Sequence, residues 1–156
     1  MKDYTILKIK DKSDSYYTHL KDIFDIPFRL VIVGKSFLSG KSTLILNMLL
    51  RDKFYKDHFD GENIYIISNN KMDNKIRILK QEKEIPNDNF MEFSEPNLER
   101  IYEKVEEDCL EAISENEKPV NALIILDDVA FSGDLRAKMN GTLSRIFCNG
   151  RHCNLS

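Results

Sequence analysis

The amino-acid sequence predicts an α/β fold in which helices cover both faces of a mostly parallel sheet. Three short apolar runs recur along the chain and end at glycine or polar residues, and stretches with helical spacing of apolar residues separate them. Strands that are apolar at every position are typical of parallel sheets buried on both faces. With 156 residues, 42% of them apolar and 31% charged, the chain suits one globular domain and not a disordered segment.

The first half of the chain is expected to form three strands and a helix. A strand at 4–10 and an amphipathic stretch at 16–24 precede the apolar run at 28–33. This run ends at a glycine and is expected to be a buried central strand. A helix is expected over 41–51, because four apolar residues fall on one of its faces, and a second buried strand follows at 63–67.

The second half continues the alternation of strands and helices. A weaker helical pattern at 72–79 and a short edge strand at 90–93 come first. A long amphipathic helix over 94–113 begins with a serine N-cap and a proline in its first turn. A third buried strand is expected at 122–126, and apolar residues at helical spacing over 135–147 predict a last helix.

The net charge of −3 is unevenly distributed along the chain. Residues 82–118 hold thirteen acidic and four basic side chains, whereas residues 135–156 hold four basic side chains and no acidic one. A polyanionic partner would therefore meet the C-terminal part of the chain. We interpret the acidic stretch as the solvated face of a helix.

The start of the chain and its cysteines bear on the cellular compartment. The first residues lack the charged and apolar segments of a secretory signal, and no apolar run approaches the roughly 18 residues of a membrane span. Three cysteines, an odd number, exclude a scaffold in which every cysteine is paired in a disulfide. We therefore expect an intracellular protein, not a secreted one, with no membrane partner.

The most specific motif lies between the expected strand at 28–33 and the expected helix at 41–51, and resembles a phosphate-binding loop. In such a loop, backbone N–H groups surround the phosphates and the start of the helix adds a favourable dipole. The lysine contacts the β- and γ-phosphates, and the hydroxyl that follows it coordinates Mg²⁺. The residues expected to bind nucleotide are Gly34, Lys35, Ser36, Ser39, Gly40, Lys41, Ser42 and Thr43.

This loop departs from the usual motif in two ways. Five residues separate its glycines where the motif has four, and Phe37 and Leu38 are bulkier than the residues usual there. Either the loop bulges by one residue or it binds nucleotide more weakly. The plainer alternative is that residues 39–43 only start a helix after a turn.

A second element supports the nucleotide interpretation. The strand expected at 122–126 ends in Asp127 and Asp128, 86 residues after Lys41. Ligands of open α/β sheets bind at the carboxyl ends of the strands, so the two carboxylates are expected beside the phosphate loop. Asp127 is expected to hold Mg²⁺ opposite Ser42, and Asp128 to orient or deprotonate the attacking water. The plainer alternative is an ordinary turn, where aspartate is common.

Residues 28–36 and 39–42 resemble the start of viral genome-packaging ATPases of the FtsK–HerA type, which occur in poxviruses, other large DNA viruses and virophages. Residues 126–132 and 149–156 are similar to two further segments of that family, and the resemblance covers roughly residues 27–156. The strand with the Asp-Asp pair and the later Arg-His-x-Asn-x-Ser segment are its more specific parts, because many NTPases share the phosphate loop.

The resemblance implies a P-loop NTPase-like core at 28–156 after an N-terminal lead-in strand and helix at 1–27. It further implies a homo-oligomeric ring that hydrolyses ATP with Mg²⁺ and drives double-stranded DNA into a viral capsid. The location would be the host cytoplasm, a virus factory or the virion. The catalytic residues would be Lys41, Asp127 and Asp128, and the Mg²⁺ ligands Ser42 and Asp127.

The end of the chain departs from the pattern of these ATPases. In the family, the Arg-His-x-Asn-x-Ser segment, here residues 151–156, opens another buried strand. That strand inserts between the strand before the phosphate loop and the strand that ends at Asp127. Because it would follow Ser156, the core is expected to be incomplete at the C-terminus, and the sheet to have a gap or a changed strand order.

Other functions stay open at the level of the sequence. A degenerate or truncated P-loop domain would not turn over, and a small nucleoside or metabolite kinase would need an arginine-rich lid that the sequence lacks. Arg151 is a candidate arginine finger or DNA contact, and equally a surface residue. Cys148, His152 and Cys153 are too few ligands for a closed zinc site, so Mg²⁺ is the only metal expected.

Overall fold

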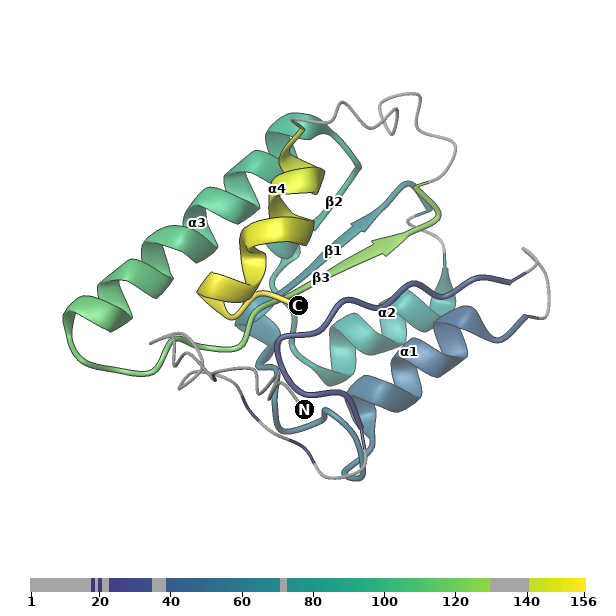
Figure 1. The fold of residues 1–156 in the computed structure, drawn as a ribbon. Coiled ribbons are helices and arrows are strands. Elements are labelled where there is room, and N and C mark those ends of the chain that lie inside the picture. The colour runs from purple at the N-terminus through teal and green to yellow at the C-terminus, as the bar shows by residue number, and fades with distance from the viewer. Residues whose placement is uncertain (1–17, 19, 21–22, 35–38, 71–72, 130–140) are drawn as a thin grey trace, which may run out of the picture.

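The computed structural model describes residues 18, 20, 23–34, 39–70, 73–129 and 141–156 (Figure 1). In this part of the chain strands and helices alternate, as the sequence predicts, while the strand expected at 4–10 lies outside it. The elements are α1 (Lys41–Leu50), β1 (Ile64–Ser68), α2 (Asn74–Glu82), β2 (Phe90–Met91), α3 (Glu95–Ser114), β3 (Leu123–Asp127) and α4 (Thr142–Asn149), with short 3₁₀ turns at Gly61–Asn63, Asn87–Asn89 and Gly150–Cys153.

The described residues form a sheet of three parallel strands in the order β2-β1-β3. β1 lies in the centre and all five of its residues are buried, which explains its apolar sequence. Its register with β3 pairs Ile64 with Leu123 and Ser68 with Asp127. The carboxyl ends of β1 and β3 therefore meet at one end of the sheet.

Helices cover both faces of this sheet, which confirms the predicted fold class (Figure 1). Successive side chains of a strand point to opposite faces. Ile64 and Ile66 accordingly pack in the core that includes α1 and α2, while Tyr65 and Ile67 pack in the core that includes α3 and α4. The buried helical residues are Leu49, Ile76 and Leu79 on the first face and Leu98, Ile101, Tyr102, Val105, Cys109 and Ile146 on the second.

The longest helix, α3, begins as its sequence predicts. The Ser94 hydroxyl accepts a hydrogen bond from the Asn97 N–H at 3.2 Å, and Pro96 lies in the first turn, where the helix needs no backbone donor. The acidic residues of α3 are exposed or half-buried, in agreement with a solvated face. Ile113, near the end of the helix, is 38% exposed, so the apolar face stops short of it.

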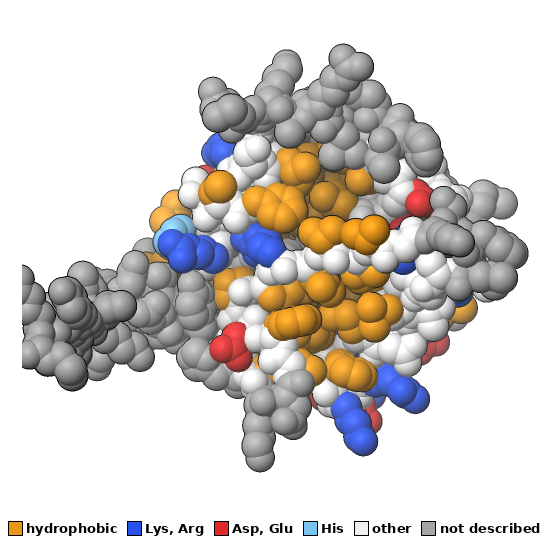
Figure 2. Space-filling view, turned by 45° about the vertical axis from the view of Figure 1, so that its right-hand side comes forward, with side chains coloured by type: hydrophobic (Ala, Val, Ile, Leu, Met, Phe, Trp, Pro, Cys, Tyr) orange, Lys and Arg blue, Asp and Glu red, His pale blue; other side chains and the backbone are white. Residues whose placement is uncertain are grey.

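The apolar run at 28–33 is not the buried central strand that the sequence predicts. It runs beside the sheet without joining it, and Val31 and Val33 are 72% and 90% exposed. Only its start is packed, where the Phe28 ring contacts those of Tyr55 and Phe59. Figure 2 shows hydrophobic side chains gathered on a face of the molecule that is open to solvent.

The physical reason is that this run lacks a neighbouring strand in the described residues. In the sheet that the described residues form, β3 is an edge strand, and on its open side these residues pair it only with the last residues of the chain. Ser156 N–H donates to Ala122 O at 2.8 Å, and Ile124 N–H donates to Ser156 O at 3.0 Å. Beyond Ile124 a groove lies between β3 and the run at 28–33. An apolar run without a partner on its sides stays exposed.

Arg29 ties the start of this run to the C-terminal residues. Its guanidinium donates to the carbonyl oxygens of Leu155 at 2.6 Å and Ile146 at 2.9 Å, so it reaches the last turn of α4. Gly150 leaves room for it, since a Cβ atom there would lie 2.8 Å from the guanidinium. Phe28 and Arg29 thus fix where the chain enters the loop that the sequence predicts to bind phosphate.

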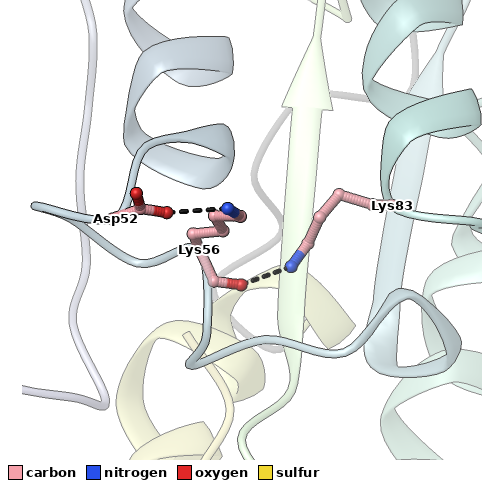
Figure 3. Close-up of polar contacts among 3 residues, drawn as sticks. All are labelled: Asp52, Lys56 and Lys83. Atoms are coloured by element: carbon pink, nitrogen blue, oxygen red, sulfur yellow. Dashed lines mark hydrogen bonds and ion pairs between the residues drawn. The ribbon is translucent and has the colours of Figure 1, made fainter.

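Polar contacts fix the connection between α1 and β1 (Figure 3). Lys56 Nζ lies 2.7 Å from Asp52 Oδ1, and Lys83, just after α2, donates to Lys56 O at 2.6 Å. Partial burial lowers the pKa of the Lys83 ammonium. Gly61 is required here, because a Cβ atom would lie 1.8 Å from the Lys83 carbonyl oxygen. The connection is therefore docked firmly against the end of α2.

The last helix, expected over 135–147, is described only from residue 141 onward. Within α4, Ile146 is buried as predicted, but Phe147 is 47% exposed and does not belong to the buried face. Among the described helices, none combines the length and the apolar composition that crossing a membrane requires.

Candidate functional site

The loop predicted to bind phosphate is described at its two ends. Gly40, the N-cap of α1, has a φ of 78°, a left-handed conformation that glycine adopts without strain. A Cβ atom on Gly34 would lie 2.9 Å from Cβ of Ser39, so the chain returns close to its starting point. The loop therefore closes although five residues separate its glycines. Lys35, Ser36, Phe37 and Leu38 lie outside the described residues.

Lys41, the first residue of α1, folds back over this loop. Its Nζ atom donates to Gly34 O and to Ser39 Oγ, both at 3.2 Å. Ser42 and Thr43 complete the first turn of α1, which has neither a capping side chain nor an acidic residue. The N–H groups of a first turn lack partners within the helix and carry partial positive charge. This arrangement of donors suits an anion.

Asp127 ends β3, as the sequence predicts. It is 7% exposed, and its Oδ2 atom has no hydrogen-bond partner among the described residues. Burial raises the pKa of the Asp127 carboxyl, the charges of Asp128 and Asp73 add to this, and the Lys41 ammonium opposes it. A buried carboxylate oxygen without a donor is costly and therefore uncommon in folded proteins unless a ligand or a catalytic role accounts for it.

Asp128 forms the turn directly after β3. Its φ is 51°, in the left-handed region that costs most residues about 1 kcal/mol or more but that aspartate tolerates. Its side chain is exposed, in contrast to that of Asp127. The two neighbouring carboxylates thus have different surroundings, since Asp127 is buried at the end of β3 and Asp128 is exposed.

A groove of about 610 Å³ brings these residues together. Its polar lining includes Gly34, Lys41, Asp127 and Asp128, while its apolar lining comes from the run at 28–33, α1, β3 and α4. The lysine of the loop and the acidic pair, 86 residues apart in the chain, therefore border one open space.

The oxygen atoms available at this place fit Mg²⁺. Magnesium is usually held by one or two carboxylates together with waters and phosphate oxygens. Asp127 offers a buried Oδ2 atom without a protein donor, and Ser42 offers a hydroxyl at the start of α1. Asp127 lines the groove and could therefore hold the metal ion that the sequence predicts, whereas Ser42 is not among the lining residues, although its neighbour Lys41 is.

A comparison with models of protein families shows to which family the chain belongs. The family model described as Poxvirus A32 protein matches residues 16–156, which is most of the chain. The chain belongs to the Poxvirus A32 family. No curated protein and no solved structure matches it significantly. The match to the A32 family confirms the resemblance to poxvirus proteins drawn from the sequence, although its description names no reaction.

In this A32-family chain, three residues near the candidate site were not selected by the sequence analysis. Ser68 pairs in register with Asp127. Asp73 caps α2, and its charge acts on Asp127. Lys75 Nζ donates to Thr43 Oγ1 at 2.7 Å. A signal was present, because polar residues that follow one parallel strand lie at the same end of the sheet as those that follow its neighbours.

The remaining candidate residues lie near the C-terminal turn. Arg151 is exposed there. Exposure is required for a contact with a partner, but it is equally expected of a solvated surface residue. Cys153 is buried in the core beside Cys109 of α3, whose thiol donates to His152 O at 3.6 Å, and burial raises the pKa of Cys153 to about 12. Cys148 is exposed. Cys153 therefore belongs to the core on the α3 side.

We expect that replacing Asp127 with asparagine stabilises the ligand-free chain at neutral pH. Because the pKa of Asp127 is raised in the folded state, the folded chain binds this proton more tightly than the unfolded chain does. The free energy of unfolding therefore falls as pH rises from the ordinary value near 3.8 through the folded-state pKa. Asparagine removes the buried charge and should gain about 1 kcal/mol at pH 7.

Thermal unfolding of wild type, Asp127→Asn and Asp108→Asn at pH 7 and pH 4 checks this. Asp108 is an exposed aspartate of α3 and should respond little to the same change. The gain for Asp127→Asn should shrink at pH 4. A loss of stability at pH 7 would show that the carboxylate has a stabilising partner.

Proposed function

We propose that this chain binds Mg²⁺–ATP in the groove and hydrolyses it as a subunit of a motor that moves double-stranded DNA. The observation that carries the proposal is the juxtaposition, in one groove, of a closed loop bearing Lys41 and the buried Asp127 carboxylate. Membership of the Poxvirus A32 family and the resemblance to genome-packaging ATPases support DNA as the polymer and a viral capsid as its destination.

Each residue has a role that follows from its position. The Lys41 ammonium would exchange its contacts with Gly34 and Ser39 for the β- and γ-phosphates. Ser42 and Asp127 would hold Mg²⁺, which when bound neutralises negative charge on the phosphate oxygens. Asp128, exposed beside the groove, would orient the attacking water and accept its proton.

Assembly and location complete the proposal. A ring of identical subunits would place Arg151, which is exposed, within reach of a neighbour or of the DNA backbone. The four basic residues of 135–156, with no acidic residue among them, favour this part of the chain for a polyanion. The motor would act in the host cytoplasm, a virus factory or the virion.

The test is phosphate release from Mg²⁺–ATP with and without double-stranded DNA, for wild type and for Asp128→Asn. We expect release by wild type that DNA stimulates. Asp128→Asn should keep nucleotide binding and lose about 100-fold or more in rate, which is the usual contribution of a general base. Asparagine also tolerates the left-handed backbone of this position, so the fold should be kept.

Two other outcomes would replace the proposal with a different function. Transfer of phosphate to a small acceptor, without an effect of DNA, would identify a kinase. Binding of Mg²⁺–ATP without turnover would leave a nucleotide-binding domain that is not a motor by itself. The exposed run at 28–33 is the feature that favours this second outcome, since within the described residues no strand on either side supports the start of the loop.

A further inference from the structure

Lys75 lies at a fixed position beside the phosphate loop. It is the second residue of α2, and the Asp73 carboxylate caps this helix by accepting hydrogen bonds from the N–H groups of Lys75 at 2.7 Å and Ile76 at 3.4 Å. The cap fixes the backbone of Lys75. Since α2 packs against α1, the side chain of Lys75 extends toward the start of α1.

The ammonium of Lys75 lies at the first turn of α1, residues 41–43, where the proposed function places the phosphates. Its Nζ atom donates to Thr43 Oγ1 at 2.7 Å, and in the described part of the chain this side chain forms no ion pair. An ammonium has three donors, so two stay available after the bond to Thr43. The Lys41 ammonium meanwhile lies on Gly34 and Ser39. Two cations from different helices therefore border the first turn of α1.

We infer that Lys75 is a further phosphate-binding residue of this site, contacting the phosphate nearest the ribose of a bound nucleotide. The inference rests on the proposed function, because it takes the first turn of α1 to be where the phosphates bind. In such loops the lysine reaches the β- and γ-phosphates, whereas backbone N–H groups surround the α- and β-phosphates. The Lys75 ammonium, which is hydrogen-bonded to Thr43 in this turn, is thus positioned to contact the inner phosphate.

This role gives Lys75 a signature that differs from that of Lys41. ATP and ADP share the inner phosphate, so loss of the Lys75 charge should weaken both nucleotides equally. Loss of Lys41 should weaken ATP more than ADP, since the γ-phosphate is absent from ADP. A lysine that only ties α2 to α1 would instead change the stability of the ligand-free chain and leave affinity unaltered.

The experiment measures the dissociation constants of Mg²⁺–ATP and Mg²⁺–ADP for wild type, Lys75→Gln, Lys75→Arg, Lys80→Gln and Lys41→Ala, together with ligand-free thermal unfolding. Lys80 lies on the same helix but contacts Asn87 at 2.8 Å and the Phe90 ring. We expect Lys75→Gln to weaken both nucleotides about tenfold, as for one charge-assisted hydrogen bond. Lys75→Arg should restore most of the affinity, and Lys80→Gln should bind as wild type.

Each outcome decides the inference. Equal affinities of wild type and Lys75→Gln, while Lys41→Ala loses binding, would overturn the role of Lys75 and leave the proposed function intact. A fall in the unfolding temperature of Lys75→Gln with unchanged affinity would make the residue a structural tie between helices. If wild type bound neither nucleotide, the proposed function and the role of Lys75 would both fall.

Discussion

Replacing Lys41 with alanine is expected to abolish the stabilisation that Mg²⁺–ATP gives the wild-type chain. A ligand present at about 100 times its dissociation constant adds about 2.7 kcal/mol to the free energy of unfolding. For a chain of this size, that corresponds to a rise of several degrees in the unfolding temperature. The alanine variant lacks the ammonium that contacts Gly34 and Ser39 and that would contact the outer phosphates.

Differential scanning calorimetry measures this shift. The samples are wild type, Lys41→Ala and Lys53→Ala, each with and without Mg²⁺–ATP. Lys53 is an exposed lysine shortly after α1 and should leave the shift unaltered. Because the Lys41 ammonium also favours the charged form of Asp127, its loss should lower the unfolding temperature of the ligand-free variant, so the shift with Mg²⁺–ATP is measured against each variant without ligand. A shift of equal size in wild type and Lys41→Ala would place the nucleotide elsewhere on the molecule.

Replacing Phe59 with alanine is expected to cost about 3–5 kcal/mol of the free energy of unfolding, the usual range for a fully buried phenylalanine. Phe59 is 0% exposed, and its ring packs against those of Tyr55 and Phe28 with centroids 6.0 and 6.1 Å away. Since domains of this kind are stable by only about 5–15 kcal/mol, the loss is a large part of the total.

Phe147→Ala is the matched control for this second prediction. Phe147 is 47% exposed on α4, so the same truncation should change stability by about 0.5 kcal/mol. Urea unfolding of both variants and wild type gives the comparison. Similar losses for the two variants would show that the connection after α1 is less well packed than its burial indicates. Because the Phe59 ring contacts the Phe28 ring, its removal would also loosen the packing of Phe28, which lies at the start of the run that leads to the predicted phosphate loop.

Local signals explain which elements could be predicted. The cap at Ser94, the proline after it and the apolar face of α3 are all encoded within a few residues, and the helix begins where they predict. β1 and β3 are apolar up to their last residues, Ser68 and Asp127, because helices pack on both faces of the sheet. Parallel pairing of β1 and β3 places Ser68 and Asp127 at one end of the sheet, as their positions after apolar runs predict. Lys41 borders the same groove as Asp127 although the run before its loop does not join the sheet.

The elements that could not be predicted depend on distant partners. The run at 28–33 has the sequence of a buried strand, but burial needs a neighbouring strand, and the groove lies where that neighbour would be. Lys75 carries no motif, and only the packing of α2 on α1 brings it to Thr43. Arg29 likewise reaches Leu155 across 126 positions of sequence, which no local pattern records.

The open side of β3 also affects how the chain behaves in solution. In the described part of the chain, an edge strand lies beside side chains as exposed as those of Val31 and Val33, so a strand edge and apolar surface occur in one place. Surfaces of this kind favour aggregation, and the electrostatic repulsion from a net charge of only −3 opposes aggregation weakly. Colloidal stability, and not only folding stability, therefore sets how concentrated this chain can become, and salt that screens the remaining charge should lower that limit further.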